Sequence, residues 1–517
     1  MVATAPEDAG VVAPVGRVRG AAAGVLAAAA ATAAGELAGQ VVPGGDSPLL
    51  AVSDRTIGLA TPGLRDAAVG TLGTADKPVL VAGVVLTVLA LGAFAGLRGR
   101  RQISSAYTLI AVLAAFAGVC VAAGPKGTAV GAAVVSVALG LVGACALRLL
   151  LLPGAAPVSP LASRRLFLLR GGALAALTLL AGGASRALAT RVDVERLRSL
   201  LRLPAPVRPA PGDIAAGTLP VRGISPLLTP NGAFYRIDTA LSVPRVDSRT
   251  WTLQVKGMVD RPLTLSYADL LAMRQYEADI TLQCVSNEVG GDLVGNARWQ
   301  GVLLSDLLAM VGVQAGADQL VGRSVDNFTA GFPTSVAIDG RPAMVAVGMN
   351  GEPLPQDHGF PARLVVPGLY GYVSATKWLA SIELTTLEGF DGFWIPRGWA
   401  KLAPIKVASR IDVPATFTRL TAGPVVVAGV AWAPGPRRGV VRVEVRVDEG
   451  RWQDADLAGA LSQDAWRQWR WRWDATPGEH LLEVRATDRT GAVQDGRRRP
   501  QRPDGATGYH GVLVRAD

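Results

Sequence analysis

One cysteine in the second half of the chain is placed where a side chain could do chemistry. Cys284 ends a predicted strand over residues 279–283 and opens the glycine-rich loop VSNEVGGDLVGNARW. Loops of this kind present side chains to ligands. The thiol could act as a nucleophile, bind a soft metal, or be an inert buried residue. A nucleophile also needs a histidine and an acid nearby, and His358 is the candidate histidine, so all three interpretations stay open.

The remaining cysteines and histidines limit the redox groups that the chain could hold. Cys120 and Cys145 lie in apolar stretches, where a thiol behaves as a small hydrophobic side chain. The three histidines, His358, His480 and His510, all lie in the second half. We therefore expect neither a haem held by a histidine pair in the apolar stretches nor an iron–sulfur cluster.

The first third of the chain is apolar enough to lie in a membrane. Of 517 residues, 50% are hydrophobic and 18% are charged. Crossing a bilayer core takes about 20 apolar residues in a helix. Glu36 is the one acidic residue inside such a stretch, and we expect it to be a wetted residue near the membrane surface. A transmembrane domain over residues 1–185 is predicted, with spans at 21–42, 78–97, 104–123, 127–146 and 166–185.

The charged residues between the spans predict the orientation of the chain. Short cytoplasmic loops carry an excess of lysine and arginine. Arginines before the first span, at 98–101 and at 148–170 all fall on one side, whereas loops 43–77 and 124–126 show no positive excess. We therefore predict a cytoplasmic N-terminus and an exported second half. The net charge of +10 then reflects membrane topology, and nucleic-acid binding is not expected.

A short run before the fifth span resembles a twin-arginine export signal. Residues 163–168 read SRRLFL and precede the weakly hydrophobic GGALAALTLLAGGAS. Such a signal would mean that the exported part folds in the cytoplasm, as proteins that acquire a complex cofactor do. The alternative is that the two arginines only set the orientation of the span.

The exported half is predicted to contain a linker and two domains. Residues 186–227 are rich in proline and predict a semi-rigid extended linker. Residues 228–402 mix short strands and helices without a regular repeat, which predicts an α+β domain. Residues 403–517 contain alternating apolar runs such as 441–447 and 469–473, which predict an all-β sandwich of the immunoglobulin type. Its alternating tryptophans are expected to pack in the core.

Three longer runs in the exported half resemble a known family. TLQCVSNEVGG, ARWQGVLLSDLL and MNGEPLPQDHGFPARLVVPGLYGYVSATKWL, in this order, resemble the molybdenum-cofactor domain of the sulfite oxidase family. The run from VAGVAWAPG to TGYHGVLV is similar to the dimerisation domain of that family, so the resemblance covers about residues 228–517. The whole architecture looks like that of polytopic, membrane-anchored actinobacterial members with five spans.

The resemblance implies a cofactor and a set of site residues. It implies a molybdenum ion held by the dithiolene of one pyranopterin, by oxo groups and by the thiolate of Cys284. Catalytic roles are implied for Cys284, Tyr235 and Arg236, with Asp238 in the same run. The cofactor-binding residues that it implies are His358, Arg363, Lys377, Thr376, Asn287 and Asp326.

The chain departs from the family pattern just after Cys284. Asn287, Glu288 and Val289 stand where sulfite oxidases carry an asparagine and two arginines, and Phe390 stands near the place of an active-site tyrosine. Fewer cations and an added acid weaken the binding of a doubly charged oxyanion. We therefore expect a pocket less suited to sulfite than that of the family.

These observations predict a membrane-anchored, molybdopterin-dependent oxidoreductase that resembles sulfite oxidase and transfers an oxygen atom in its exported domain. Its substrate would be a small oxyanion, or an S-oxide or N-oxide if the enzyme works as a reductase. A non-catalytic anchored binding module is the alternative from another class. Electrons would pass through an external carrier such as a c-type cytochrome or another membrane redox protein. The C-terminal domain type suggests a homodimer.

Overall fold

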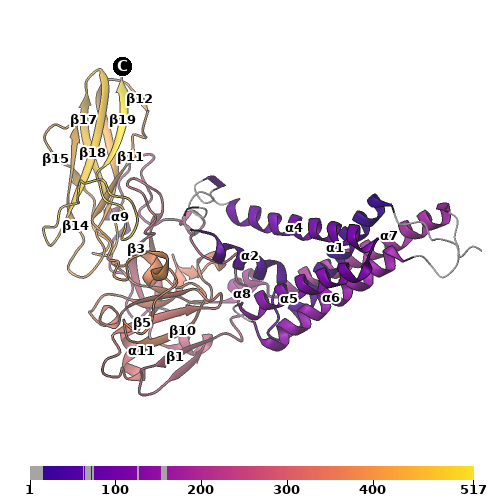
Figure 1. The fold of residues 1–517 in the computed structure, drawn as a ribbon. Coiled ribbons are helices and arrows are strands. Elements are labelled where there is room, and N and C mark those ends of the chain that lie inside the picture. The colour runs from indigo at the N-terminus through magenta and orange to yellow at the C-terminus, as the bar shows by residue number, and fades with distance from the viewer. Residues whose placement is uncertain (1–15, 62, 64–70, 73–74, 125–126, 153–159) are drawn as a thin grey trace, which may run out of the picture. The chain divides into compact units, whose positions relative to one another are not determined.

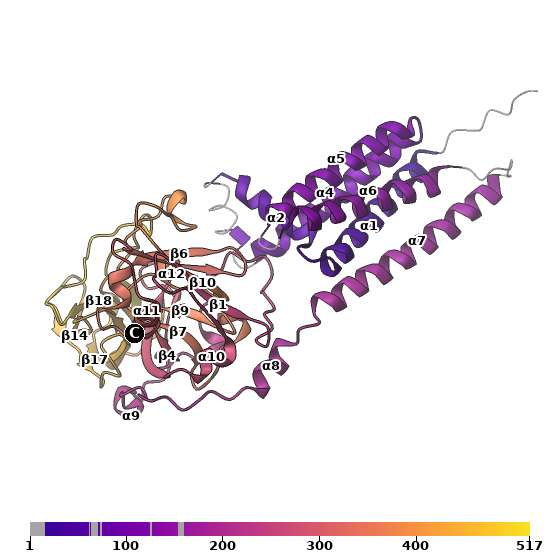
Figure 2. The same ribbon diagram turned by 90° about the horizontal axis from the view of Figure 1, so that it is seen from below.

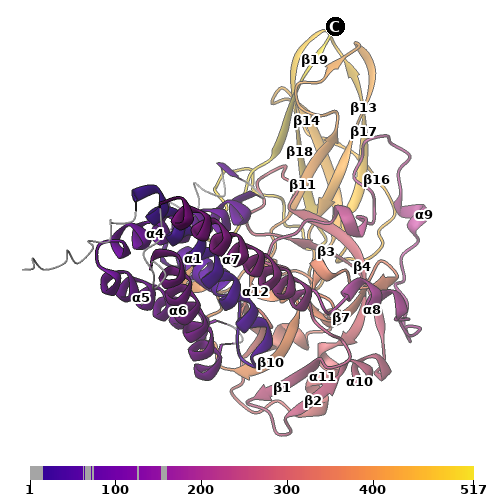
Figure 3. The same ribbon diagram turned by 90° about the vertical axis from the view of Figure 1, so that its right-hand side faces the viewer.

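The protein divides into two compact units, Met1–Val192 and Asp193–Asp517. They are drawn in Figures 1, 2 and 3. The structure is a computed structural model, and it describes residues 16–61, 63, 71–72, 75–124, 127–152 and 160–517. The first 15 residues of the expected transmembrane domain, and parts of the loops that predicted its orientation, lie outside the described residues.

The first unit is helical. Its described residues include five helices that are long and apolar enough to cross a membrane, in agreement with the five expected stretches. The last of them extends beyond the expected 166–185 at both ends. The helices are α1 (Arg17–Val41), α4 (Asp76–Gly99), α5 (Ile103–Ala122), α6 (Ala129–Leu151) and α7 (Pro160–Ala189).

Small residues let the helices of this unit approach closely. A Cβ atom added to Gly24 of α1 would lie 1.9 Å from the carbonyl oxygen of Gly92 in α4, and one added to Gly96 would lie 2.0 Å from that of Gly20. The two backbones are therefore in direct contact, as is common where helices pack through glycine and alanine. The buried residues of α1 are all alanine or glycine.

Glu36 has a local structural partner. Its Oε1 accepts hydrogen bonds from the Ser47 hydroxyl at 2.8 Å and from the Leu49 amide at 3.1 Å, at the start of α2 (Pro48–Leu59). A carboxylate at a helix N-terminus satisfies amide groups that have no partner within the helix. Glu36 thus joins α1 to α2.

The first part of the second unit contains two sheets and short helices. One sheet has the order β2-β1-β10-β5-β6, in which β1 and β10 run parallel with Gln254 opposite Ser381. Its strands are β1 (Thr252–Gly257), β2 (Leu263–Ser266), β5 (Gln319–Ser324), β6 (Thr329–Pro333) and β10 (Leu379–Thr385). The other sheet contains β3 (Tyr276–Gln283), β4 (Val294–Leu303), β7 (Met344–Met349), β8 (Glu352–Pro353) and β9 (Arg363–Val365).

Two helices in this part of the second unit form where the sequence has helical signals. In α11 (Leu304–Val311) the buried side chains are Leu304, Leu307, Leu308 and Val311, which form one face. In α10 (Tyr267–Ala272) the N-cap residue Ser266 and Asp269 exchange hydrogen bonds in a capping box. The mixture of strands and short helices agrees with the α+β prediction.

The C-terminal region consists of two sheets (Figure 3). Trp469, Trp471 and Trp473 are buried in one hydrophobic cluster that takes residues from both sheets, so the prediction of a tryptophan core is confirmed. One sheet contains β11 (Ala408–Val413), β13 (Gly423–Trp432), β17 (Arg467–Ala475) and β16 (Asp456–Leu457). The other contains β12 (Arg419–Leu420), β19 (His510–Ala516), β18 (Gly478–Asp488), β14 (Val440–Val447) and β15 (Gln453–Asp454).

The segment expected to be a semi-rigid linker, 186–227, is divided between the two units. Residues 186–189 belong to α7, and the residues from 193 onward belong to the second unit. The segment contains α8 (Val194–Leu200) and α9 (Ile214–Gly217), both visible in Figure 2. The Gln300 side chain donates to the Pro204 carbonyl at 2.7 Å, and the Trp466 indole donates to the Leu227 carbonyl at 2.8 Å. Extended proline-rich backbone makes no internal hydrogen bonds, so its carbonyls accept from the domains. The stretch from residue 193 to 227 is therefore part of the second unit and not a separate spacer.

Candidate active site

Six of the expected site residues line one pocket in the second unit. The pocket has a volume of about 880 Å³, its opening included. Loops that leave the strand ends supply most of its wall. The six residues are Tyr235, Cys284, Asp326, His358, Arg363 and Lys377. Aromatic side chains complete the wall, namely Phe234, Phe328, Tyr372, Trp378, Trp394 and Trp399.

Cys284 is fixed by the loop that follows β3. Its amide donates to the Leu293 carbonyl at 2.9 Å, and its carbonyl accepts from the Asn287 amide at 3.1 Å. The side-chain oxygen of Asn287 accepts from the Leu293 amide at 2.8 Å, so Asn287 closes the loop and does not line the pocket of Cys284. Burial raises the pKa of the Cys284 thiol. A thiolate at this position therefore requires a cation beside it, such as a metal ion.

Arg363 carries a buried charge without a carboxylate partner. Its side chain donates to the His358 carbonyl at 3.2 Å, and its guanidinium lies 5.0 Å from the ring centre of Trp299. No acidic group pairs with it in the fully described range 193–517. Burial lowers the pKa of Arg363 to about 10, so the side chain is still charged at neutral pH. An unpaired buried cation is costly, and an anionic ligand group would offset that cost.

Two further cations share one carboxylate at the edge of the pocket. Oδ2 of Asp238 lies 2.8 Å from Nζ of Lys377 and 2.9 Å from Nε of Arg236. Lys377 also donates to the Asp357 carbonyl at 3.1 Å. Burial lowers the pKa of Lys377 to about 8, although Asp238 opposes this shift. Arg236 itself does not line the pocket, and its side chain is 39% exposed.

His358 is held by the main chain. Its Nε2 lies 2.8 Å from the carbonyl oxygen of Asn231. A carbonyl only accepts, so Nε2 carries the proton and Nδ1 is the nitrogen left for another partner. The ring meets Phe234 edge to face, with 5.6 Å between the ring centres. Burial lowers the pKa of His358 to about 4, so the free side chain is neutral at neutral pH.

Asp326 and Thr376 differ in what they offer a ligand. Asp326 lines the pocket, and its Oδ2 is buried with no hydrogen-bond partner in the described part of the chain. A buried acceptor of this kind suits an N–H or O–H group of a ligand. Thr376 is fully buried and its hydroxyl donates to the Gly322 carbonyl at 3.4 Å. Thr376 therefore stabilises the main chain next to the pocket and does not line the pocket itself.

Several residues of the site were not expected from the sequence. Asn231 and Asp357 contact His358 and Lys377 through main-chain oxygens, and a main-chain contact leaves no trace in residue type. The indole Nε1 of Trp399 is buried without a hydrogen-bond partner among the residues the structure describes. The aromatic run FWIPRGW, which holds Trp394 and Trp399, lacks a strand or helix pattern and could have indicated a pocket wall.

Residues 240–394 match the family model of the oxidoreductase molybdopterin binding domain. The chain is 32% identical over 287 residues to mitochondrial sulfite oxidase of Rattus norvegicus, covering 47% of this chain and 52% of that protein. It is 30% identical over 281 residues to sulfite oxidase of Arabidopsis thaliana, covering 45% of this chain and 70% of that protein. The chain belongs to the sulfite oxidase family. This family member spans about half the length of the mammalian sulfite oxidases that it matches.

A solved structure is also similar to this sulfite oxidase family member. The sulfane dehydrogenase SoxCD from Paracoccus pantotrophus aligns with a TM-score of 0.50 and 26% identity, covering 59% of this chain and 84% of that chain. The family implies a molybdenum–pterin cofactor. The pocket fits such a group, because Arg363 lacks an anion and Asp326 lacks a donor.

Proposed function

We propose that this protein is a membrane-anchored molybdopterin oxidoreductase that transfers an oxygen atom in an exported domain, as a sulfite oxidase does. In the oxidase direction, sulfite and water give sulfate, two protons and two electrons. The observation that carries the proposal is the buried, unpaired charge of Arg363 in the pocket that also holds Cys284. A buried guanidinium binds an anionic group with two parallel hydrogen bonds, and an anionic cofactor would supply that partner to Arg363.

Different pocket residues would bind different parts of the cofactor. When bound, the molybdenum cofactor supplies the two-electron chemistry, and Cys284 would be its protein ligand. Arg363 and Lys377 would bind the phosphate of the pterin. The negative charge of the phosphate would favour the doubly protonated ring of His358, which would then donate to it from Nδ1, and Oδ2 of Asp326 would accept from an N–H group. Asn287 and Thr376, whose side chains bond to the main chain, would keep the loop after Cys284 and the strand β5 in place.

Tyr235 and Arg236 would act on the substrate side. Burial raises the pKa of the Tyr235 hydroxyl, which therefore stays protonated and donates a hydrogen bond to a substrate oxygen. Arg236 is half-exposed and is held by Asp238, so it would attract an anion at the mouth of the pocket. Both roles fit oxygen-atom transfer to or from a small substrate.

The aromatic wall favours an alternative substrate class, a neutral S-oxide or N-oxide. Arg236 and Lys377 are already paired with Asp238, and Glu288 and Val289 stand where the family has arginines. Trp394 and Trp399 line the pocket, and Nε1 of Trp399 is a buried donor for one oxygen. In this direction the S-oxide takes up two electrons and two protons and gives a sulfide and water.

The same proposal includes a location in the cell membrane. The five apolar helices would anchor it, with the N-terminus in the cytoplasm and the second unit outside, and the run 163–168 would direct export through a twin-arginine signal. The two-sheet C-terminal region would be an immunoglobulin-like dimerisation domain. Electrons would be exchanged with a c-type cytochrome or a membrane redox protein.

The test is the molybdenum content of detergent-purified protein made in a host that synthesises the cofactor. We expect about one metal per chain by elemental analysis. Dye-linked turnover of sulfite, and of a panel of S-oxides and N-oxides, then identifies the substrate class. Well-folded protein without molybdenum or turnover would instead support the non-catalytic binding module.

A further inference from the structure

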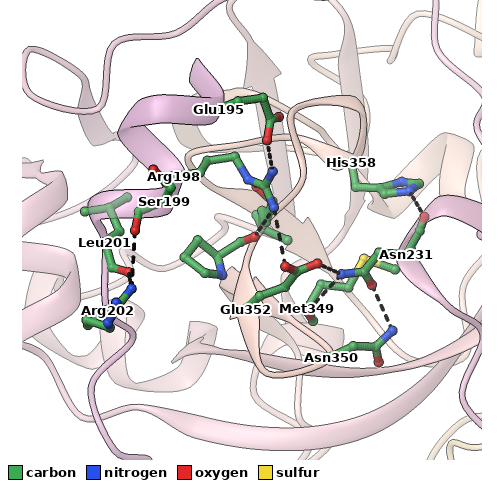
Figure 4. Close-up of polar contacts among 12 residues, drawn as sticks. Glu195, Arg198, Ser199, Leu201, Arg202, Asn231, Met349, Asn350, Glu352 and His358 are labelled. Carbon is green, nitrogen blue, oxygen red and sulfur yellow. Dashed lines mark hydrogen bonds and ion pairs between the residues drawn. The ribbon is translucent and has the colours of Figure 1, made fainter. Parts of the chain in front are cut away.

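The short helix α8 is attached to the body of the second unit by Arg198 (Figure 4). Nε of Arg198 donates to the Leu354 carbonyl at 2.7 Å, and Nη2 donates to the Pro353 carbonyl at 2.9 Å. Nη1 lies 2.6 Å from Glu195 and Nη2 lies 4.0 Å from Glu352. These carboxylates are more than half exposed, so the ion pairs contribute little, and the two carbonyl bonds fix the helix.

The strand β8, whose Pro353 carbonyl accepts from Arg198, also bonds to the turn that contains Asn231. Oε1 of Glu352 accepts from the Asn231 side-chain nitrogen at 2.5 Å. The Asn231 side-chain oxygen accepts from Asn350 at 2.8 Å, and its nitrogen donates to the Met349 carbonyl at 3.3 Å. A three-residue turn such as η2 (Asn231–Ala233) is weak by itself. These side-chain bonds, together with the bond from the Thr229 amide to the Asn296 carbonyl at 2.7 Å, hold the main chain of Asn231 in place.

That main chain is the partner of His358. The Asn231 carbonyl lies 2.8 Å from Nε2 of His358, as Figure 4 shows, and this bond sets which ring nitrogen carries the proton. The hydrogen-bonded path thus runs from Arg198 in α8 through the β8 backbone and Glu352 to Asn231 and then to His358. All of its members lie in the second unit.

We propose that Arg198, Glu352 and Asn231 are positioning residues for His358, so that α8 is a structural part of the cofactor pocket. The inference rests on the proposed function, in which His358 faces the pterin phosphate. Hydrogen bonds behind a ligating histidine fix its tautomer and its direction. Loss of the path would leave the ring in the pocket but free to turn, and the cofactor would be held less tightly.

The experiment measures how fast the full-length protein in detergent loses its pterin after dilution, from the fluorescence of the released pterin. Arg198→Ala, Asn231→Ala and Glu352→Ala are expected to release it about ten-fold faster than the unmodified chain. Glu352→Gln keeps an oxygen that accepts from Asn231 and is expected to restore slow release. Arg202→Ala is the matched control, because Arg202 bonds only to the nearby carbonyls of Ser199 and Leu201.

A double-mutant cycle separates positioning from general support of the fold. In a His358→Ala background, Arg198→Ala is expected to have no further effect on release, because the residue through which it acts is gone. An additional loss in that background, or release from Arg198→Ala and Asn231→Ala as slow as from Arg202→Ala, overturns the inference while the proposed function stands. An unmodified chain without pterin overturns the proposed function itself, and the inference with it.

Discussion

The arginines of the C-terminal two-sheet region and the buried arginine of the pocket differ in their partners. Arg485 makes a two-point contact with Glu444, with distances of 2.9 Å and 3.0 Å, and Arg438 lies 2.9 Å from Asp488. Both carboxylates are nearly inaccessible, at 4% and 1% exposure. Among the described residues, Arg363 has carbonyl oxygens and an aromatic face as its partners. Arg485 and Arg438 thus find their anions within the protein, whereas a ligand would have to supply the anion for Arg363.

The largest effect is expected from the thiol of the pocket. Cys284→Ala should lose molybdenum and reduce dye-linked turnover by more than about 1000-fold, because the metal loses its protein ligand. Elemental analysis and steady-state rates measure both. Cys120→Ala, in α5, should keep metal and activity. Full metal content in Cys284→Ala would show that the pocket does not use this thiol.

Replacing one arginine in each region should affect stability differently. Arg485→Met leaves the buried carboxylate of Glu444 with only the more exposed Arg442, 3.2 Å away among the described residues, and should lower the free energy of unfolding by about 2 kcal/mol. Arg363→Met removes an unpaired cation and should leave cofactor-free protein as stable as before or slightly more stable, while its cofactor retention falls. Denaturant midpoints of cofactor-free protein test this. Equal destabilisation by both substitutions would break the comparison.

The histidines should show a similar contrast in their response to acid. Burial lowers the pKa values of His358 and His510 to about 4, and the Nδ1 of His510 accepts from the Ile411 amide. An unfolded histidine takes up its proton near pH 6.5, so cofactor-free protein should lose stability as the pH falls from about 6.5 to 4, by on the order of 3 kcal/mol for His358. Stability that rose in this range would contradict the prediction.

His480 serves as the opposite case. Its hydrogen bond to Asp448 at 2.6 Å raises its pKa. Its contribution is therefore complete below pH 6.5 and is lost as the pH rises through the raised pKa. His480→Gln should leave the acid-side loss unchanged, whereas His510→Gln should reduce it. Denaturant midpoints measured from about pH 4 to about pH 8, the range in which histidines titrate, distinguish the two variants.

The smallest effect is expected from an exposed pair in the same sheet as Glu444. The side chains of Arg442 and Asp454 lie 2.5 Å apart and are 53% and 66% exposed. Arg442→Ala should leave the denaturant midpoint almost unchanged, because solvent screens the pair and Glu444 keeps Arg485. A loss as large as that from Arg485→Met would show that burial is not what separates the two pairs.

The sequence predicted the parts of the protein that depend on local pattern. Apolar length places the five helices, alternation places Trp469, Trp471 and Trp473 in a core, and the glycine-rich loop after Cys284 marks the pocket. Each of these signals is contained in a few consecutive residues. A periodic pattern or an apolar run therefore suffices to read them.

Contacts between distant segments could not be predicted in the same way. The pairing of Asp238 with Lys377 and the contact of Asn231 with His358 join residues more than 100 positions apart. Residue type also does not give direction, so Asn287 and Thr376, expected to bind the cofactor, face the protein backbone instead. Proline content predicted extended chain at 186–227 but not the side chains that donate to it.

The parallel pairing of β1 with β10 affects when the pocket can fold during synthesis. These neighbouring strands lie at opposite ends of the pocket domain in sequence, and the Trp466 indole must also reach back to Leu227. A ribosome that has passed Cys284 has therefore not yet supplied the central partner of β1. Contacts across such distances form late. The pocket is thus expected to reach its final form only after the C-terminal strands have left the ribosome.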